Sequence, residues 1–332
     1  MLRVFVTHNP EDLDAYYGRS LPPLQDIAEV RVNPLDRDLT TPELIDAAKE
    51  CQVIVAHRAT PGDAELFAQS PDLVAFLRTA VDISTVDVDA ASGNGVLVAH
   101  ADKSFVASTA ELALALMLDL SRNVSASTID YGSGQQPPQR GGVQMSGRTA
   151  GIIGLGAIGS YLAELLQGIG MTVVAHDPHV TEADVEMVSF AELLGRSDYV
   201  LPLAVSIPET HGLIGEAELS AMKPGAFLVN VSRGELLDEA AVAAALDSGH
   251  LGGLGMDVGQ APDQRPSPEL AARPGVVATP HLGGLTPENA DAQAASSVEQ
   301  VQAMLEQRMP PRTVNEYAAT RLRALWTGAV DG

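Results

Sequence analysis

The sequence contains one cysteine, only three lysines, and no apolar run long enough to span a membrane. A lone cysteine cannot form an internal disulfide, so a disulfide-stapled scaffold is excluded. Cys51 stands beside the apolar segment "VIVA" (53–56), which favours a buried structural thiol over a nucleophile. The first residues, "MLRVFVTHNPEDLDAY", lack the basic and apolar regions of a signal peptide. We therefore expect a cytoplasmic protein.

Basic residues are scarce, because 20 lysines and arginines stand against 43 acidic residues and the formal net charge is −23. This balance disfavours nucleic-acid binding, which needs a basic surface to neutralise phosphates. A strongly acidic surface is typical of a well-solvated protein. An anionic ligand would need local positive charge, so arginines near a predicted cleft are candidate ligand-binding residues.

The length and composition predict a two-domain α/β protein. A chain of 332 residues, 45% hydrophobic and 19% charged, exceeds what one ordinary core holds. In its first hundred residues we expect strands at 2–7, 28–33, 52–57, 73–79 and 95–100, and helices at 41–50 and 62–70. Alternation of this kind indicates a parallel, doubly wound sheet.

The same alternation restarts after residue 148. Strands are expected at 149–154, 171–177, 199–204, 226–231, 252–258 and 275–280. Before them, Ser108 and Glu111 fit a capping box that begins an apolar helix. Its apolar residues predict burial on most sides, and the helix could also serve as a subunit interface. We expect a loop at 131–142, a helix at 288–309, and a helical tail at 316–326 that packs on the first domain.

A glycine-rich turn lies between the strand at 149–154 and the next helix. Gly154, Gly156 and Gly159 form the pattern G-x-G-x-x-G. The first glycine permits a tight turn, the second lets the backbone approach a pyrophosphate, and the third lets helix and strand pack closely. The amides of Ala157 and Ile158 would face the pyrophosphate at the helix N-terminus.

Asp177 ends the strand that follows this helix. A carboxylate there accepts hydrogen bonds from the adenosine ribose and repels a 2′-phosphate. The next residues, "PHV", supply no arginine for such a phosphate. The pattern therefore predicts NAD rather than NADP.

Two later segments carry candidate chemistry. Arg233 follows a buried strand at its carboxyl end, where open α/β sheets bind ligands and a guanidinium can hold a carboxylate. His281 follows another strand, with Gly283 and Gly284 leaving room for a cofactor ring, and histidine carries protons near neutral pH. Taken singly, a surface arginine and a structural or solvated histidine are the better explanations of these residues.

Four motifs occur together in the order "GIIGLGAIG", "VNVSRGELLDEAAVAAAL", "MDV" and "TPHLGG". With them the chain resembles the D-isomer-specific 2-hydroxyacid dehydrogenases. The resemblance implies an α/β fold of two doubly wound parallel-sheet domains. A split, flavodoxin-like substrate domain (1–99 and 288–332) would flank a Rossmann NAD-binding domain (100–287). It also implies a homodimer formed through the cofactor domains, and a small anionic 2-oxo or 2-hydroxy acid as substrate.

The resemblance also implies residue roles. Arg233 would bind the substrate carboxylate and carbonyl oxygen, and His281 would give and take the proton. Asp257 would lie at the nicotinamide end of NAD, and Val231 and Gly284 would belong to the cofactor site. No metal is implied.

One departure from the family concerns a catalytic glutamate. Members usually read D-V-F-x-x-E-P where this chain has "DVGQAPDQ", so the glutamate becomes Ala261 or Pro262. A carboxylate beside an imidazole raises its pKa, so without one His281 should titrate lower and reduction should weaken as pH rises. Gln260 could orient His281 without charging it, Asp263 could restore the charge, or neither contacts it.

Further departures concern substrate binding. Ala80, Val81 and Asp82 occupy a turn that is usually glycine-containing and binds the substrate carboxylate, so Asp82 places a negative side chain there unless it points away. Phe105 replaces a usual asparagine and would wall an apolar pocket or pack in the hinge. Arg58 matches a position that often helps to bind substrate, but a solvated loop arginine is the alternative.

These observations favour an NAD-dependent D-2-hydroxyacid dehydrogenase. Hydride abstraction from a small oxyanion such as formate is an alternative on the same fold. An NAD-binding regulatory protein without turnover is an alternative from another class. The sequence does not name the substrate side chain or the physiological direction.

Overall fold

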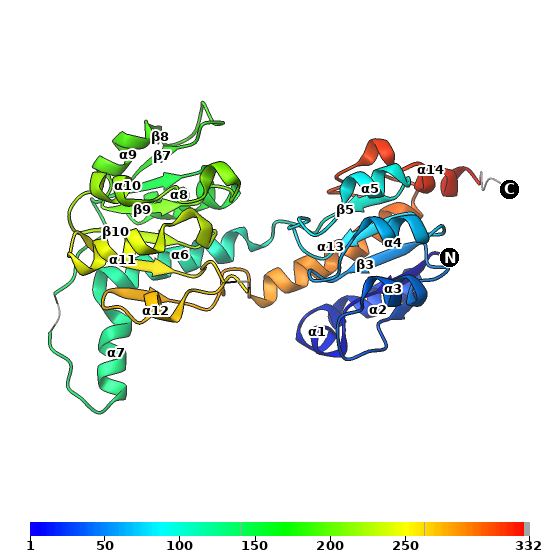
Figure 1. Cartoon of the computed structure of the whole chain (residues 1–332), viewed down its shortest axis with the longest axis horizontal. Helices are drawn as coiled ribbons and strands as arrows, with labels where there is room; N and C mark the ends of the chain where they lie inside the picture. The colour runs from blue at the N-terminus through cyan, green and yellow to red at the C-terminus, as the bar shows by residue number, and fades with distance from the viewer. Residues whose placement is uncertain (140, 262, 329–332) are drawn as a thin grey trace. The chain divides into compact units, whose positions relative to one another are not determined.

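The computed structural model describes residues 1–139, 141–261 and 263–328. Two compact units make up the chain (Figure 1). Unit 1 comprises Met1–Ser104 together with Pro287–Gly332, and unit 2 comprises Phe105–Thr286. Along the described residues, no helix combines the length and the apolarity needed to cross a membrane.

Unit 1 is built on a five-stranded parallel sheet. Its strand order, β2-β1-β3-β4-β5, is that of flavodoxin-like folds, so this part of the fold prediction is confirmed. Side chains alternate across the sheet: Val4 and Val6 enter one core and Phe5 enters the other. The strands are β1 (Arg3–Val6), β2 (Glu29–Val32), β3 (Val53–Ala56), β4 (Ala75–Arg78) and β5 (Leu97–Ala99).

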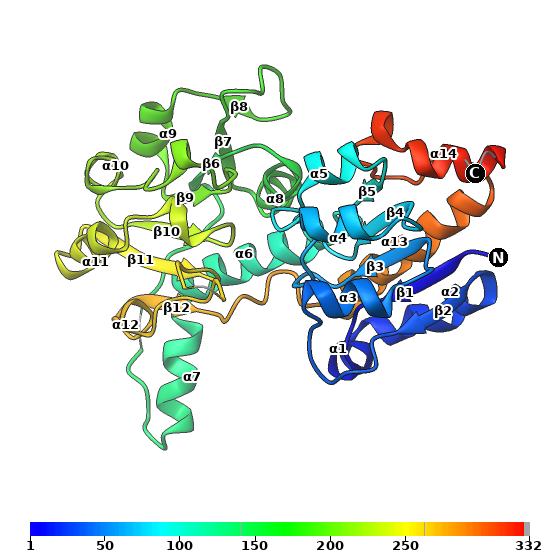
Figure 2. The same cartoon turned by 45° about the vertical axis from the view of Figure 1, so that its right-hand side comes forward.

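Helices cover both faces of this sheet (Figures 1 and 2). One core includes residues of α2 (Leu21–Ile27), α13 (Pro287–Leu305) and α14 (Thr320–Thr327). The other includes residues of α3 (Thr41–Ala47), α4 (Ala64–Gln69) and α5 (Val88–Gly93). The tail packs on unit 1 as predicted, because Trp326 Nε1 donates to the Met304 carbonyl oxygen at 2.9 Å.

Unit 2 is built on a seven-stranded parallel sheet of order β12-β11-β10-β9-β6-β7-β8. The order reverses between β6 and β9, as in Rossmann folds, which confirms the second half of the fold prediction. The sequence predicted six of these strands and missed the two-residue β8. The strands are β6 (Thr149–Ile153), β7 (Thr172–His176), β8 (Glu186–Met187), β9 (Tyr199–Pro202), β10 (Ala226–Asn230), β11 (Leu251–Met256) and β12 (Val276–Ala278).

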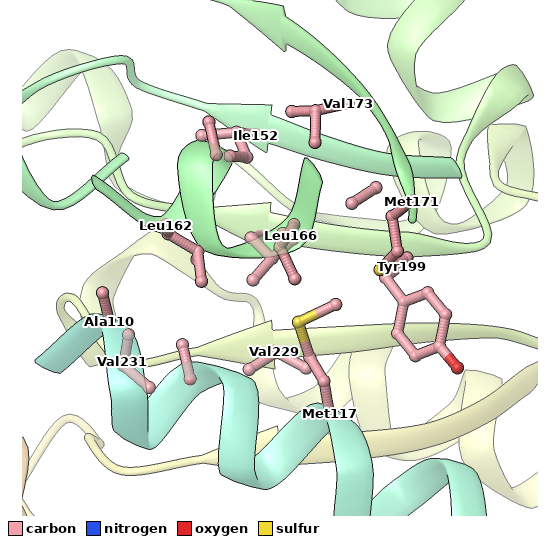
Figure 3. Close-up of a cluster of buried hydrophobic side chains, with 14 of the residues drawn as sticks. Ala110, Met117, Ile152, Leu162, Leu166, Met171, Val173, Tyr199, Val229 and Val231 are labelled. Carbon is pink, nitrogen blue, oxygen red and sulfur yellow. The ribbon is translucent and has the colours of Figure 1, made fainter. Parts of the chain in front are cut away.

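One face of this sheet carries a well-packed core. Figure 3 shows Met117 from α6 (Phe105–Arg122) and Leu166 from α8 (Ala157–Gly168) between their helices and the sheet. Tyr199 closes one side of this core, and its hydroxyl lies 2.7 Å from Ser121 Oγ. The remaining helices are α7 (Val124–Gly132), α9 (Phe190–Arg196), α10 (Glu216–Ala221), α11 (Glu239–Asp247) and α12 (Pro268–Ala271).

Around α6, two expectations were wrong and one was right. The helix begins at Phe105, so Ser108 lies inside it and does not cap it. Its hydroxyl donates to the Phe105 carbonyl oxygen, a bond that serine makes within helices. Burial on most sides is confirmed, because the exposed residues, among them Glu111 and Leu118, follow one strip of the helix and the others are buried or half-buried. The left-handed Asn123 then separates α6 from α7, which includes two residues predicted as loop.

Candidate cofactor and active site

The glycine turn after β6 has the backbone geometry that its residues predict. Gly154 has φ +96°, and a Cβ there would lie 2.6 Å from the backbone nitrogen of Ala204. A Cβ on Gly159 would lie 2.4 Å from the Gly154 carbonyl oxygen, so helix α8 packs tightly on the turn. A Cβ on Gly156 would meet no atom within 4 Å. Backbone atoms therefore lie close to the first and third glycines of the turn, and space is open at the second, Gly156.

Helix α8 begins at this open position. Gly156 is its N-cap, and Ala157 and Ile158 are its first residues. Their amides have no carbonyl partner inside the helix, so they can donate to an anion, which the helix dipole also favours. Asp177, just after β7, accepts from the Leu155 amide at 2.9 Å. The carboxylate is therefore fixed against the glycine turn, with lone pairs left for a ribose hydroxyl.

Asp257, just after β11, organises the segment that carries His281. It is fully buried (0% exposed), and its Oδ1 accepts from Thr279 Oγ1 at 2.6 Å and from the Leu282 amide at 2.7 Å. Its Oδ2 accepts from the Gly283 amide at 2.8 Å. These three hydrogen bonds are called the Asp257 clasp below. His281 lies between the residues that form them and has φ +61°, a left-handed conformation that costs energy for a non-glycine residue. The His281 amide donates to the Asp257 carbonyl oxygen at 2.9 Å.

Asp257→Asn tests this clasp. An asparagine side chain has one acceptor oxygen and a donor amide, so at least one of the three donors loses its acceptor. We expect the free energy of unfolding to fall by about 1–3 kcal/mol, measured by urea denaturation. Turnover should fall with it, because His281 loses its fixed backbone. Asp263→Asn, in an exposed position of the same loop, is the control and should change stability by less than about 0.5 kcal/mol. Equal stability of both variants would contradict the clasp.

Arg233 is presented by a turn that Asn230 shapes. Asn230, at the end of β10, is fully buried; its Nδ2 donates to the Arg233 carbonyl oxygen at 2.8 Å and its Oδ1 accepts from the Ser232 amide at 3.0 Å. The half-buried Arg233 donates through Nη1 to the Ser232 carbonyl oxygen. Among the described residues it forms no ion pair. Its positive charge is therefore available to an anion.

The segments carrying these groups lie along one edge of the sheet. Strands β10, β11 and β12 are parallel neighbours, so Arg233, Asp257 and His281 all follow carboxyl ends at that edge. A Cβ on Gly234 would lie 2.1 Å from the carbonyl carbon of Gly259, which shows how closely the first two segments approach. Carboxyl edges of open α/β sheets are where such folds bind ligands.

Val231 and Gly284, both expected at the cofactor site, differ in how far they are buried. Val231 is only 5% exposed and its side chain belongs to the core in Figure 3, so only its backbone could face a cofactor. Gly284 is half-buried and follows Gly283, where a Cβ would lie 3.1 Å from Asp257 Oδ2.

The candidate replacements for the missing glutamate are bonded to other groups. Gln260 Nε2 donates to the Leu237 carbonyl oxygen at 2.9 Å. Asp263 accepts from the Arg265 amide at 3.2 Å, and its Oδ2 lies 3.5 Å from Arg265 Nε. Ala261 is exposed, and Pro262 lies outside the described residues.

The candidate substrate residues are spread over both units. In unit 1, Arg58 is exposed just after β3, and Val81 is half-buried after β4. Asp82 accepts from the Ser84 amide at 2.8 Å and so stabilises its own turn. In unit 2, the half-buried Phe105 is the first residue of α6.

Sequence reasoning missed Arg78, the last residue of β4. It is 1% exposed, and its guanidinium donates to the carbonyl oxygens of His57 and Thr60 and to Thr85 Oγ1. Burial lowers its pKa to about 10. These bonds fix the loop on either side of Arg58. The available signal was an arginine at the end of an otherwise apolar strand, "LVAFLR".

Comparisons with known proteins agree with this geometry. Residues 114–283 match the family described as "D-isomer specific 2-hydroxyacid dehydrogenase, NAD binding domain". The chain is 39% identical to D-3-phosphoglycerate dehydrogenase of Mycobacterium tuberculosis over 303 residues, 88% of this chain and 56% of that protein. It is 31% identical to glyoxylate reductase of Korarchaeum cryptofilum over 283 residues, 82% of this chain and 85% of that one.

A solved structure matches both units. The TT0316 protein of Thermus thermophilus is 32% identical, with a TM-score of 0.83 over 94% of this chain and all of that one. The chain spans little more than half the length of the phosphoglycerate dehydrogenases that it matches. The family's NAD-binding description also confirms the predicted cofactor. Sequence, fold and comparisons together show that the chain belongs to the D-isomer specific 2-hydroxyacid dehydrogenase family.

Proposed function

We propose that the chain is an NAD-dependent enzyme that interconverts a 2-oxo acid and a D-2-hydroxy acid. The observation that carries this proposal is the common sheet edge at which Arg233, Asp257 and His281 stand, in the same unit as the glycine turn and Asp177. NADH, when bound, supplies the hydride that reduces the 2-oxo carbon. The chain's own residues must bind the acid, orient its carbonyl group and move one proton.

Arg233 is proposed to bind the substrate. Its guanidinium has no carboxylate partner among the described residues, and a planar fork of donors matches a carboxylate and a neighbouring carbonyl oxygen. Buried Asn230 holds the backbone of its turn, and Arg233 Nη1 donates to the Ser232 carbonyl oxygen, so the guanidinium is positioned without substrate. In a chain of net charge −23, such a cation is what concentrates an anionic substrate locally.

His281 is proposed to donate the proton to the carbonyl oxygen during reduction and to accept it during oxidation. Histidine is suited to this task because its ordinary pKa lies near neutrality. The hydrogen bonds to Asp257 fix the backbone of His281. Less conformational entropy of His281 is therefore lost when the transition state forms.

The proposed substrate is a small anionic acid. The two named relatives act, by their names, on phosphoglycerate and glyoxylate, which are both small 2-hydroxy or 2-oxo acids. Arg58 is proposed as a further substrate-binding residue, because it is exposed and forms no ion pair among the described residues. The test of the function is oxidation of NADH that depends on an added 2-oxo acid.

We also propose that the chain forms a homodimer through unit 2. Helix α7 extends away from the sheet of unit 2 in both views (Figures 1 and 2). It exposes Val124 (55%), Ile129 (70%) and Tyr131 (67%), and Leu118 of α6 adds a further exposed side chain (45%). Large exposed apolar side chains concentrated on one helix and its neighbour favour a protein interface there.

Ile129→Asp tests the homodimer. A buried, unpaired charge at an interface is strongly unfavourable, so we expect the variant to elute as a monomer in light-scattering chromatography. Leu305→Asp, in α13 of unit 1, replaces another exposed hydrophobic residue and should leave the dimer intact. A monomeric wild-type chain, or a dimer that withstands Ile129→Asp, would contradict the interface.

A further inference from the structure

Three potential metal ligands meet in unit 1, outside the site described above. Asp12 belongs to α1 (Pro10–Ala15), Asp38 to the loop before α3, and His57 to the segment after β3. One ligand atom from each lies within 4.8 Å of the other two. His57 Nε2 is 3.7 Å from Asp12 Oδ1, and His57 Nδ1 is 3.6 Å from Asp38 Oδ1.

The two carboxylates have no other partner. Neither side chain accepts a hydrogen bond from the described residues, and no lysine or arginine among them forms an ion pair with either. Asp12 Oδ2 is buried without any partner. Arg58 is adjacent to His57 in sequence, yet it too leaves both carboxylates unpaired. A buried carboxylate oxygen without a donor needs an explanation, and a bound cation is one that this ligand set supplies.

His8 gives a second, independent observation. It is fully buried (0% exposed), and its Nε2 lies 3.2 Å from Thr79 Oγ1. Thr79 Oγ1 donates its own hydrogen to the Ala56 carbonyl oxygen, so it can only accept from His8. The proton therefore sits on Nε2, and Nδ1 carries a lone pair that has no partner. The rings of His8 and His57 meet edge to face with centres 5.3 Å apart, so a second buried imidazole with an unpartnered nitrogen lies beside the cluster.

We propose that Asp12, Asp38 and His57 bind a divalent ion of the zinc type in unit 1. One imidazole and two carboxylates are a ligand set that zinc accepts, at about 2.0–2.2 Å per ligand. Ligands at such distances around a tetrahedral ion are separated by about 3.4 Å. His57 would give the ion one of its two ring nitrogens, and the three ligand atoms, which lie within 4.8 Å of one another, would draw together around it. Magnesium and calcium prefer all-oxygen sets, so the imidazole disfavours them.

The proposed ion would join three separate segments of unit 1. It would hold α1 and the loop before α3 against the carboxyl end of β3. His57 precedes Arg58, and Arg78 holds the carbonyl oxygen of His57, so the ion would also fix the approach to Arg58. The fourth position is open to water.

Zinc titration of the chelator-treated full-length chain tests the proposal, with a chromophoric chelator as competitor. We expect one zinc ion per chain and thermal stability that rises with zinc concentration, as binding to the folded state requires. Asp12→Asn, Asp38→Asn and His57→Asn should each weaken binding by about 100-fold or more, since even outer-shell partners cost 10- to 100-fold. Asp14→Asn and Asp36→Asn, exposed neighbours on the same segments, should bind as wild type.

A cobalt experiment covers the case in which a variant fails to fold. Co²⁺ added to the wild-type chain should develop the intense visible absorption of a tetrahedral site, and zinc should displace it. Absence of stoichiometric zinc or cobalt binding would overturn the proposal. Zinc binding that is unchanged in the three ligand variants would overturn it as well, because the ion would then sit elsewhere.

Discussion

Replacing His281 with asparagine should lower kcat for 2-oxo acid reduction by about 100- to 10,000-fold, the range that a positioned proton carrier contributes. Asparagine has no group that titrates near neutrality, but it tolerates the left-handed backbone that His281 adopts. The loss should therefore reflect missing proton transfer and not a rearranged loop. NADH binding, followed by fluorescence, should stay close to that of wild type. His281→Ala should lose most turnover too, with some added backbone strain.

The matched control is His250→Asn. His250 immediately precedes β11, at the opposite end of that strand from Asp257, and hydrogen-bonds the Leu219 carbonyl oxygen. This variant should keep wild-type turnover. An His281→Asn enzyme with full activity would remove His281 from the proposed mechanism.

Replacing Arg233 with glutamine should lower kcat/KM by about 30- to 5,000-fold, corresponding to the 2–5 kcal/mol lost when one partner of a hydrogen-bonded charge pair is removed. Both KM and kcat should change, because the guanidinium binds the carboxylate and orients the carbonyl group. Arg233→Lys should recover only part of the loss, since an ammonium keeps the charge but lacks the planar fork. Steady-state kinetics over substrate concentration separate the two effects.

Arg265→Gln is the control for Arg233. Arg265 stands in the loop after β11 and is exposed, and its near partner is Asp263 in the same loop. Its loss should leave kcat/KM unchanged. If Arg233→Lys restores full activity, a point charge is sufficient and the proposed fork is wrong.

The fold was largely predictable, because two local patterns encode it. Short β-rich segments alternating with helices predicted both parallel sheets, and the strand orders of both units agree with the predicted fold classes. The glycine turn was predictable because Gly154 and Gly159 each stand where a Cβ would overlap backbone atoms. The short elements α1, α2 and α5 and the strand β8 were missed, since two to seven residues give little periodicity. The capping box at Ser108 failed because its hydroxyl bonds back to Phe105.

The candidate site was predictable only where a motif is contiguous. Arg233 and His281 stand in sequence motifs, but the residues that hold them in place do not. Asn230 and Arg78 act through backbone carbonyl groups, and such bonds appear only after folding. The cluster of Asp12, Asp38 and His57 was invisible for the same reason, because its members come from three segments that only the sheet of unit 1 brings together.

The most direct test of the proposed function is the loss of NADH absorbance when the wild-type chain is mixed with a panel of small 2-oxo acids. We predict turnover with at least one of them, and D-configured hydroxy acid as the product. Tight NADH binding without turnover on any 2-oxo acid would contradict the proposed function and would identify an NAD-binding protein that is not a dehydrogenase.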